Sequence, residues 1–186
     1  MNKDTKMIIT TAVSLFLICA VAAGLLGVVN NITAPQISAN SIETANESRK
    51  EVLSSADNFT EQTLDDGTVY YTGEADGNVV GYVFTVSGKG YGGEIELMVG
   101  VNTDGAVTGL SILSIDETPG LGMNAKKDSF INQYIGKSGE LTVVKNTTPG
   151  DSEILAITSA TITSKAVTSA VNDALSLYKT VTGQEG

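Results

Sequence analysis

The stretch from Val79 to Leu113, VVGYVFTVSGKGYGGEIELMVGVNTDGAVTGLSIL, decides the fold. Its first part, Val79 to Val86, is rich in β-branched and aromatic residues, which are typical of strands. In the second part, Glu94 to Val101, apolar residues recur at every other position, which is typical of a strand with one buried face. After a turn signal at Asp104-Gly105, Ala106 to Leu113 predicts a further strand. The stretch therefore predicts an antiparallel meander.

On either side of the meander the pattern changes. Upstream, Val69 to Thr72 predicts another strand, followed by a turn at Asp76-Gly77-Asn78. Downstream we expect a helix, a short strand and a long amphipathic helix, at Lys126–Ile135, Leu141–Val144 and Thr163–Val181. The long helix has an apolar face made of Val167, Ala170, Val171, Ala174, Leu175 and Tyr178. Strands followed by helices predict an α+β domain, here an antiparallel sheet with flanking helices.

The first 29 residues are of a different kind. From Met7 to Val29 the chain carries no charge, and as a helix this stretch is long enough to span the hydrocarbon core of a bilayer, roughly 30 Å. A cleaved signal peptide is the alternative, but its apolar core is normally shorter, roughly 7–15 residues. We therefore predict a cytoplasmic N-terminus and an uncleaved transmembrane anchor in residues 1–29.

Basic residues set the predicted orientation. Lys3 and Lys6 precede the apolar stretch, and the next basic residue is Arg49. Because positive charge stays on the cytoplasmic side, we expect a single-pass protein of the cell membrane whose C-terminal domain is extracytoplasmic. Residues 30–60 are predicted to be a juxtamembrane connector, with a helix from Gln36 to Ser55, and residues 61–186 to be the extracytoplasmic domain.

Composition excludes several classes of function. The chain of 186 residues has a formal net charge of −10, which disfavours nucleic acid as a partner. It has no histidine, and its one cysteine, Cys19, lies in the apolar stretch. These absences rule out catalysis by a Ser-His-Asp or Cys-His arrangement and a metal site built on His or Cys. We expect no catalytic residue and no metal ligand, and we expect the chemistry to come from a cofactor.

The most unusual segment is Ala156 to Lys165, AITSATITSK, where hydroxyl residues cluster just before the long helix. The N-terminus of a helix attracts anions, because its first N–H groups have no partner within the helix. Lys165 adds a positive charge to this segment. The alternative is that one or two of the hydroxyls simply cap the helix.

Two glycine-containing segments are further candidates. Glu117 to Gly122, ETPGLG, follows a predicted strand, and its glycines permit a close approach of the backbone to a planar ligand. A Pro-Gly pair is more often only a turn. Gly88 to Gly93 contains Tyr91 among glycines, matches no phosphate-binding template, and by itself indicates a turn.

Thr158 to Ser164, TSATITS, resembles the flavinylation motif Ser/Thr-Gly-Ala-Thr-x-Ser/Thr of the FMN-binding domain family. Ser159 stands where that motif usually has glycine, and Leu155 where many members have an acidic residue. Further stretches resemble one branch of the family, the G subunit of the Rnf complex, an ion-translocating ferredoxin:NAD oxidoreductase. They are Asn30–Pro35, Gly90–Gly93, Met98–Gly100, Glu117–Gly122 and Gln133–Lys137.

This resemblance implies FMN as a covalent cofactor, attached through a phosphoester to Thr161. It also implies a separate flavin transferase that uses FAD as the donor, because a threonine hydroxyl is a poor nucleophile without a base. The flavin ring is expected to reach the 117–122 loop and to pack on backbone at Gly120 and Gly122. The expected cofactor-binding residues are Thr161, Ser159, Ala160, Thr163, Ser164, Lys165, Glu117, Thr118, Gly120, Leu121 and Gly122.

The resemblance further implies an electron-transfer subunit of a membrane complex that couples ferredoxin:NAD electron transfer to sodium or proton translocation. Its partners would be the other membrane subunits of an Rnf-type complex, and it would have no complete activity alone. The C subunit of sodium-translocating NADH:quinone reductase and a stand-alone extracellular flavoprotein are alternatives. A membrane-anchored binding module, in which the Ser/Thr cluster is only a helix cap, is the non-redox alternative.

Overall fold

The computed structural model describes residues 12–13, 15–17, 19–24 and 47–183. The chain divides into two compact units, Met1–Ala45 and Asn46–Gly186. The predicted limits at residues 29 and 60 are not tested by this division and stay predictions.

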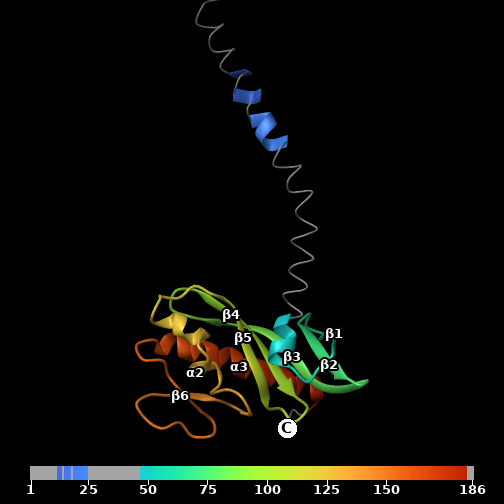
Figure 1. The fold of residues 1–186 in the computed structure, drawn as a ribbon, viewed down its shortest axis with the longest axis vertical. Helices are drawn as coiled ribbons and strands as arrows, with labels where there is room; N and C mark the ends of the chain where they lie inside the picture. Colours follow the sequence, from blue (N-terminus) through green and yellow to red (C-terminus); the bar gives the residue numbers. More distant parts are fainter. Residues whose placement is uncertain (1–11, 14, 18, 25–46, 184–186) are drawn as a thin grey trace, which may run out of the picture. The chain divides into compact units, whose positions relative to one another are not determined.

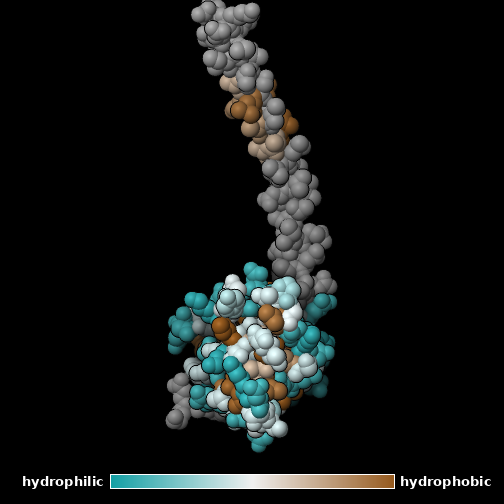
Figure 2. Space-filling model, turned by 90° about the vertical axis from the view of Figure 1, so that its left-hand side faces the viewer, coloured by the Kyte–Doolittle hydropathy of each residue, from teal (hydrophilic) through white to brown (hydrophobic). Residues whose placement is uncertain are grey.

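In the first unit, the described residues between 12 and 24 are helical. Their large apolar side chains are exposed, and Figure 2 shows this hydrophobic stretch in brown. Among the described residues, no helix combines the length and the apolar character needed to cross a membrane. Much of the predicted 7–29 span, and all of the predicted 30–35 exit, lie outside the described residues. The anchor therefore remains a prediction.

The second unit is built on a five-stranded antiparallel sheet in the order β1-β2-β3-β4-β5 (Figure 1). This order confirms the predicted meander. One strand of the sheet, the edge strand β1, was not predicted. The strands are β1 (Asn58–Thr63), β2 (Val69–Ala75), β3 (Asn78–Lys89), β4 (Glu94–Asn102) and β5 (Val107–Ile115).

The turn between β2 and β3 explains a sequence signal. Asp76 and Gly77 are the two residues between the strands, and both have positive φ angles, 50° and 76°. Two consecutive positive φ angles are what a two-residue type I′ hairpin turn requires, and Asp-Gly is a preferred pair for it. The predicted turn is confirmed.

One face of the sheet is covered by the long helix α3 (Thr161–Thr182), which packs on β3 and β4 and runs along the sheet in Figure 1. The helix begins two residues before the predicted Thr163. All six residues predicted to form its buried face are buried. They join the alternate residues of β4 that face the helix, Ile95, Leu97, Val99 and Val101, in one core.

The other face of the sheet is covered by residues 47–56, of which 47–52 are helical. Val52 and Leu53 pack there against Val83 and Met98. Thr108 Oγ1 donates a 2.6 Å hydrogen bond to the carbonyl oxygen of Val52. The predicted helix Gln36–Ser55 is described only from residue 47, and its helical conformation ends at Val52 rather than Ser55.

The predicted helix Lys126–Ile135 is wrong in its extent. The chain forms a 3₁₀ helix η1 (Gly122–Lys126) and a short α2 (Asp128–Ile131). Lys127 separates them, since its φ of −78° and ψ of 140° are extended. After α2, a small parallel sheet pairs β6 (Thr142–Val144) with β7 (Glu153–Leu155). The structure confirms the predicted strand at β6, whereas β7 was not predicted.

Candidate functional site

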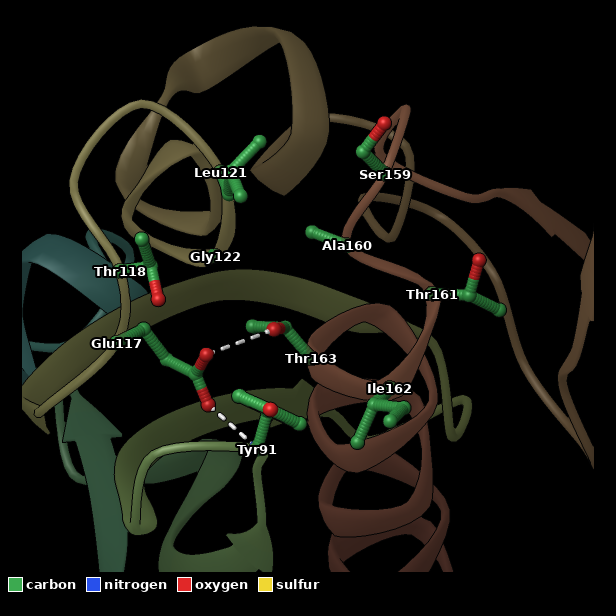
Figure 3. A pocket seen from close by; sticks show the side chains of 10 residues that line it. All are labelled: Tyr91, Glu117, Thr118, Leu121, Gly122, Ser159, Ala160, Thr161, Ile162 and Thr163. Carbon is green, nitrogen blue, oxygen red and sulfur yellow. Dashed lines mark hydrogen bonds between the residues drawn. The ribbon is translucent and has the colours of Figure 1, made fainter.

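A pocket of about 460 Å³ lies between the loop that follows β5 and the beginning of α3 (Figure 3). Its volume falls within the range of small-molecule sites, roughly 300–1,000 Å³. The pocket brings together two segments that the sequence analysis singled out separately. It is lined by Tyr91, Glu117, Thr118, Leu121, Gly122, Ser159, Ala160, Thr161, Ile162 and Thr163.

A buried carboxylate holds the walls of this pocket together. Glu117 is only 7% exposed. Its Oε1 accepts hydrogen bonds from the backbone N–H groups of Tyr91, at 2.6 Å, and Gly92, at 3.1 Å. Its Oε2 accepts a hydrogen bond from Thr163 Oγ1 at 3.1 Å, and Figure 3 shows Glu117 between Tyr91 and Thr163. One side chain therefore joins the glycine-rich segment, the loop after β5 and the first turn of α3.

The two glycines of the loop are required for different reasons. A Cβ at Gly122 would collide with Glu117 Oε2 and lie 2.8 Å from Thr163 Oγ1. Gly120 has open space around it, but its φ of +77° is one that side-chain-bearing residues rarely adopt. Both glycines are thus explained by the chain itself. Their expected packing against a flavin ring stays a prediction.

The first turn of α3 has free donors. The residue before the helix is Ala160, and no side chain caps the helix N-terminus. The N–H groups of the first helical residues, Thr161 to Thr163, have no hydrogen-bond acceptor within the helix. The hydroxyl cluster is therefore not used as a side-chain cap, which was the structural alternative for this segment.

Ser164 has a structural role instead. Its side chain is fully buried. The hydroxyl accepts a 2.9 Å hydrogen bond from the N–H of Ile157 and donates a 2.9 Å bond to the carbonyl oxygen of Ala160. These bonds close the turn that leads into α3. Ser164 was expected to contact the cofactor, but in this conformation it has no exposed atom that could do so.

Ser159 occupies the position where the flavinylation motif usually has glycine, and its φ is 63°. This left-handed conformation costs an ordinary residue roughly 1–2 kcal/mol, whereas glycine adopts it readily. A glycine at this position would adopt the turn before α3 without that cost. Ser159 adopts the same turn at an energetic cost.

Thr161 lies between two hollows. It is half-buried and lines the pocket described above as well as a second hollow of about 780 Å³. The second hollow is formed mainly by the segments 145–149 and 155–159. In Figure 3 the Thr161 hydroxyl points away from Glu117. Lys165 is exposed and lines neither hollow, so the structure does not bring it to the site.

Two residues that line the pocket beside Glu117, and most of those that line the second hollow, were not among the predicted site residues. Tyr91 is 75% exposed and Ile162 is 53% exposed, although both are large apolar side chains. A signal for Tyr91 was present, since an aromatic residue stood alone among glycines at Gly88–Gly93. For Ile162 the sequence offered only its place next to the acceptor threonine.

Comparison with known proteins identifies the family. Residues 90–176 match the FMN-binding domain family, and residues 1–52 match the RnfG N-terminal region. The chain is 40% identical over 195 residues to the G subunit of the Na(+)-translocating ferredoxin:NAD(+) oxidoreductase complex of Acetobacterium woodii, covering 95% of this chain and 94% of that one. The chain belongs to the G-subunit family of ion-translocating oxidoreductase complexes.

A second G subunit and a solved structure are also similar to this chain. The G subunit of the proton-translocating ferredoxin:NAD(+) oxidoreductase complex of Clostridium ljungdahlii is 37% identical over 183 residues, covering 98% of this chain and 97% of that one. Among solved structures, NqrC of Shewanella oneidensis is similar with a TM-score of 0.54 and 22% identity, over 65% of this chain and 66% of that one. This likeness to a solved structure shows the fold alone, and it confirms the antiparallel-sheet fold of the domain.

Proposed function

We propose that this chain carries FMN as a phosphoester on Thr161 and relays electrons within an ion-translocating ferredoxin:NAD oxidoreductase complex. The observation that carries the proposal is the position of Thr161. Thr161 is the first residue of α3, and it lines both hollows. It also lies within the region that matches the FMN-binding family.

The two hollows suit the two ends of FMN. The pocket beside Glu117 has the apolar and aromatic walls that a flavin ring needs, provided by Tyr91, Leu121 and Ile162. The second hollow contains Lys145 and several hydroxyl and amide side chains, which suit a phosphate and a ribityl chain. The free N–H groups at the start of α3 add donors for the phosphate.

The charge of Glu117 favours the same division. Among the described residues that line the two hollows, Glu117 is the only acid and Lys145 the only base. A phosphate esterified to Thr161 is repelled by the carboxylate and attracted by the ammonium group. This arrangement supports a phosphate on the Lys145 side and a ring on the Glu117 side.

Attachment requires a separate flavin transferase. Forming the phosphoester breaks the pyrophosphate bond of FAD, releases AMP and removes the proton of the Thr161 hydroxyl. Glu117, the only acid among the described residues lining the hollows, accepts hydrogen bonds from Tyr91, Gly92 and Thr163 rather than from Thr161. With no histidine in the chain, a base for this proton has to come from the transferase.

The relatives and the sequence support the proposed role in the complex. The G subunits of Acetobacterium woodii and Clostridium ljungdahlii match this chain over nearly its whole length and belong to ferredoxin:NAD(+) oxidoreductase complexes. The bound FMN would supply reversible electron transfer, and the other subunits would bind ferredoxin and NAD. The apolar stretch 7–29 would anchor the subunit in the cell membrane, with the FMN domain on the extracytoplasmic side.

The test is ferredoxin-dependent NAD reduction by membrane vesicles that contain the whole complex. Thr161→Ala should leave the complex assembled but remove NAD reduction, together with the flavin fluorescence of the denatured subunit on a gel. Thr60→Ala, on exposed β1, is the matched control and should keep both. Vesicles of the Thr161→Ala variant that reduce NAD at the normal rate would refute the proposed relay.

A further inference from the structure

Glu117 is a buried charge without a counter-charge in the pocket that it lines. No Lys or Arg is among the described residues around this pocket. Its hydrogen-bond partners are all neutral: two backbone N–H groups and the hydroxyl of Thr163. All three partners donate hydrogen bonds to the two carboxylate oxygens. The pocket therefore contains a fixed negative charge.

This carboxylate cannot easily move away. A Cβ at Gly90 would collide with Oε1, and a Cβ at Gly122 would collide with Oε2. Each oxygen is thus enclosed by backbone at a glycine as well as bound by a donor. Charges held in place in this way keep their effect on a ligand, because the protein does not rearrange to weaken it.

We infer that Glu117 is a redox-tuning residue that lowers the reduction potential of the flavin in this pocket; this inference rests on the proposed function. Two electrons from a reductant and one proton from solvent add a net negative charge to the ring. A carboxylate that lines the same pocket opposes this added charge, and the opposition is stronger in a partly buried site than in water. Charge near the ring is one of the ways in which a protein sets the potential of a flavin.

The test compares the midpoint potential of the full-length flavinylated protein with that of Glu117→Gln, titrated anaerobically with dithionite and followed by flavin absorbance. The glutamine retains an oxygen that can accept from Tyr91 and Gly92, and its amide group can bond Thr163. The potential should rise in this variant, with the reduction equilibrium shifting at least about tenfold, or about 30 mV for a two-electron couple.

The control variant removes one negative charge from a different position on the domain. Glu140 is exposed and lines neither the pocket beside Glu117 nor the second hollow. Glu140→Gln should therefore leave the potential unchanged, and Glu117→Asp should keep it close to that of the wild type. An unchanged potential in folded, flavinylated Glu117→Gln overturns the inference.

A second pair of variants covers the case in which Glu117→Gln does not fold. Leu121 lies on the rim of the same pocket and is 41% exposed, so it tolerates polar replacement. Leu121→Lys should raise the potential relative to Leu121→Gln, because the added cation offsets the carboxylate. Equal potentials in this pair overturn the inference. A wild-type protein without FMN refutes the proposed function itself, whereas bound FMN with an unaltered potential refutes the tuning role alone.

Discussion

Thr163 Oγ1 donates a 3.1 Å hydrogen bond to Glu117 Oε2. This bond connects the first turn of α3 to the loop that follows β5, although the two residues are 46 positions apart. Both side chains are buried. The pocket therefore depends on a contact between two sequence motifs that look independent along the chain.

Removing the hydroxyl should destabilise the domain. Thr163→Val keeps the shape of the side chain but leaves a buried carboxylate one donor short, which costs about 1–3 kcal/mol. Chemical denaturation followed by circular dichroism measures this loss. Thr163→Ser retains the donor and should lose less stability than Thr163→Val. A loss in Thr163→Ser as large as that in Thr163→Val would show that the methyl group contributes as much as the hydrogen bond, which contradicts this prediction.

Ser159→Gly should stabilise the domain. The φ of 63° at Ser159 favours glycine by about 1 kcal/mol, and the greater freedom of glycine in the unfolded chain offsets part of this gain. Ser159→Val should destabilise the domain, because a β-branched residue strongly disfavours positive φ. Thermal unfolding of the three proteins gives the order. A melting temperature for Ser159→Gly below that of the wild type would contradict the argument.

The sequence predicted the central strands and α3 well, because their apolar residues repeat with a clear period. The edge strand β1 has the sequence NFTEQT and is mostly exposed, so it carries almost no pattern. The break at Lys127 depends on a single extended residue between two helical turns, which periodicity does not reveal. Local patterns identify elements that bury a face and miss those that do not.

The candidate site, too, was predicted only as far as local sequence patterns reach. The sequence singled out both motifs, since Glu117–Gly122 and Ser159–Thr163 have unusual compositions. Their meeting in one pocket depends on tertiary contacts, chiefly the hydrogen bonds of Glu117. Ser164 was expected to contact the cofactor, yet its hydroxyl is used within the turn before α3. The conformation of the turn decides which hydroxyls point outward. The sequence of serines and threonines alone does not reveal this.

Stability should fall at high pH because of Tyr134. Its hydroxyl lies 2.8 Å from Thr168 Oγ1 in the core, and burial raises the pKa of Tyr134. The folded state thus keeps a proton that the unfolded chain loses above about pH 10. The contribution of Tyr134 to the free energy of unfolding is therefore complete below that pH. It decreases as the pH rises above it. Burial also raises the pKa of Tyr71, so a smaller part of the same decrease comes from that residue.

Tyr134→Phe isolates this effect. The variant should be less stable at neutral pH by about 1 kcal/mol, since one hydrogen bond is lost. Above about pH 10 its stability should decrease less with rising pH than that of the wild type. Urea denaturation at several pH values gives both slopes. Parallel curves for the two proteins would show that Tyr134 ionises as readily in the folded state as in the unfolded chain.

The predicted orientation is testable with a single cysteine. Asp65 is exposed in the turn between β1 and β2, so Asp65→Cys in a Cys19→Ala background provides one accessible thiol. A membrane-impermeant thiol reagent should label it in intact cells, with any outer membrane made permeable. The reason is the position of Lys3 and Lys6 ahead of the apolar stretch. Labelling only after lysis would place the domain in the cytoplasm.

The central claim is that Thr161 carries FMN, and mass spectrometry of the protein co-expressed with a flavin transferase tests it most directly. The intact chain should gain the mass of FMN less one water, and fragmentation should place the gain on Thr161 within the peptide that spans the start of α3. Thr161→Ala should lack the gain. A chain without the added mass, an adduct mapped to Thr158 or Thr163, or an adduct that persists in Thr161→Ala would contradict the account.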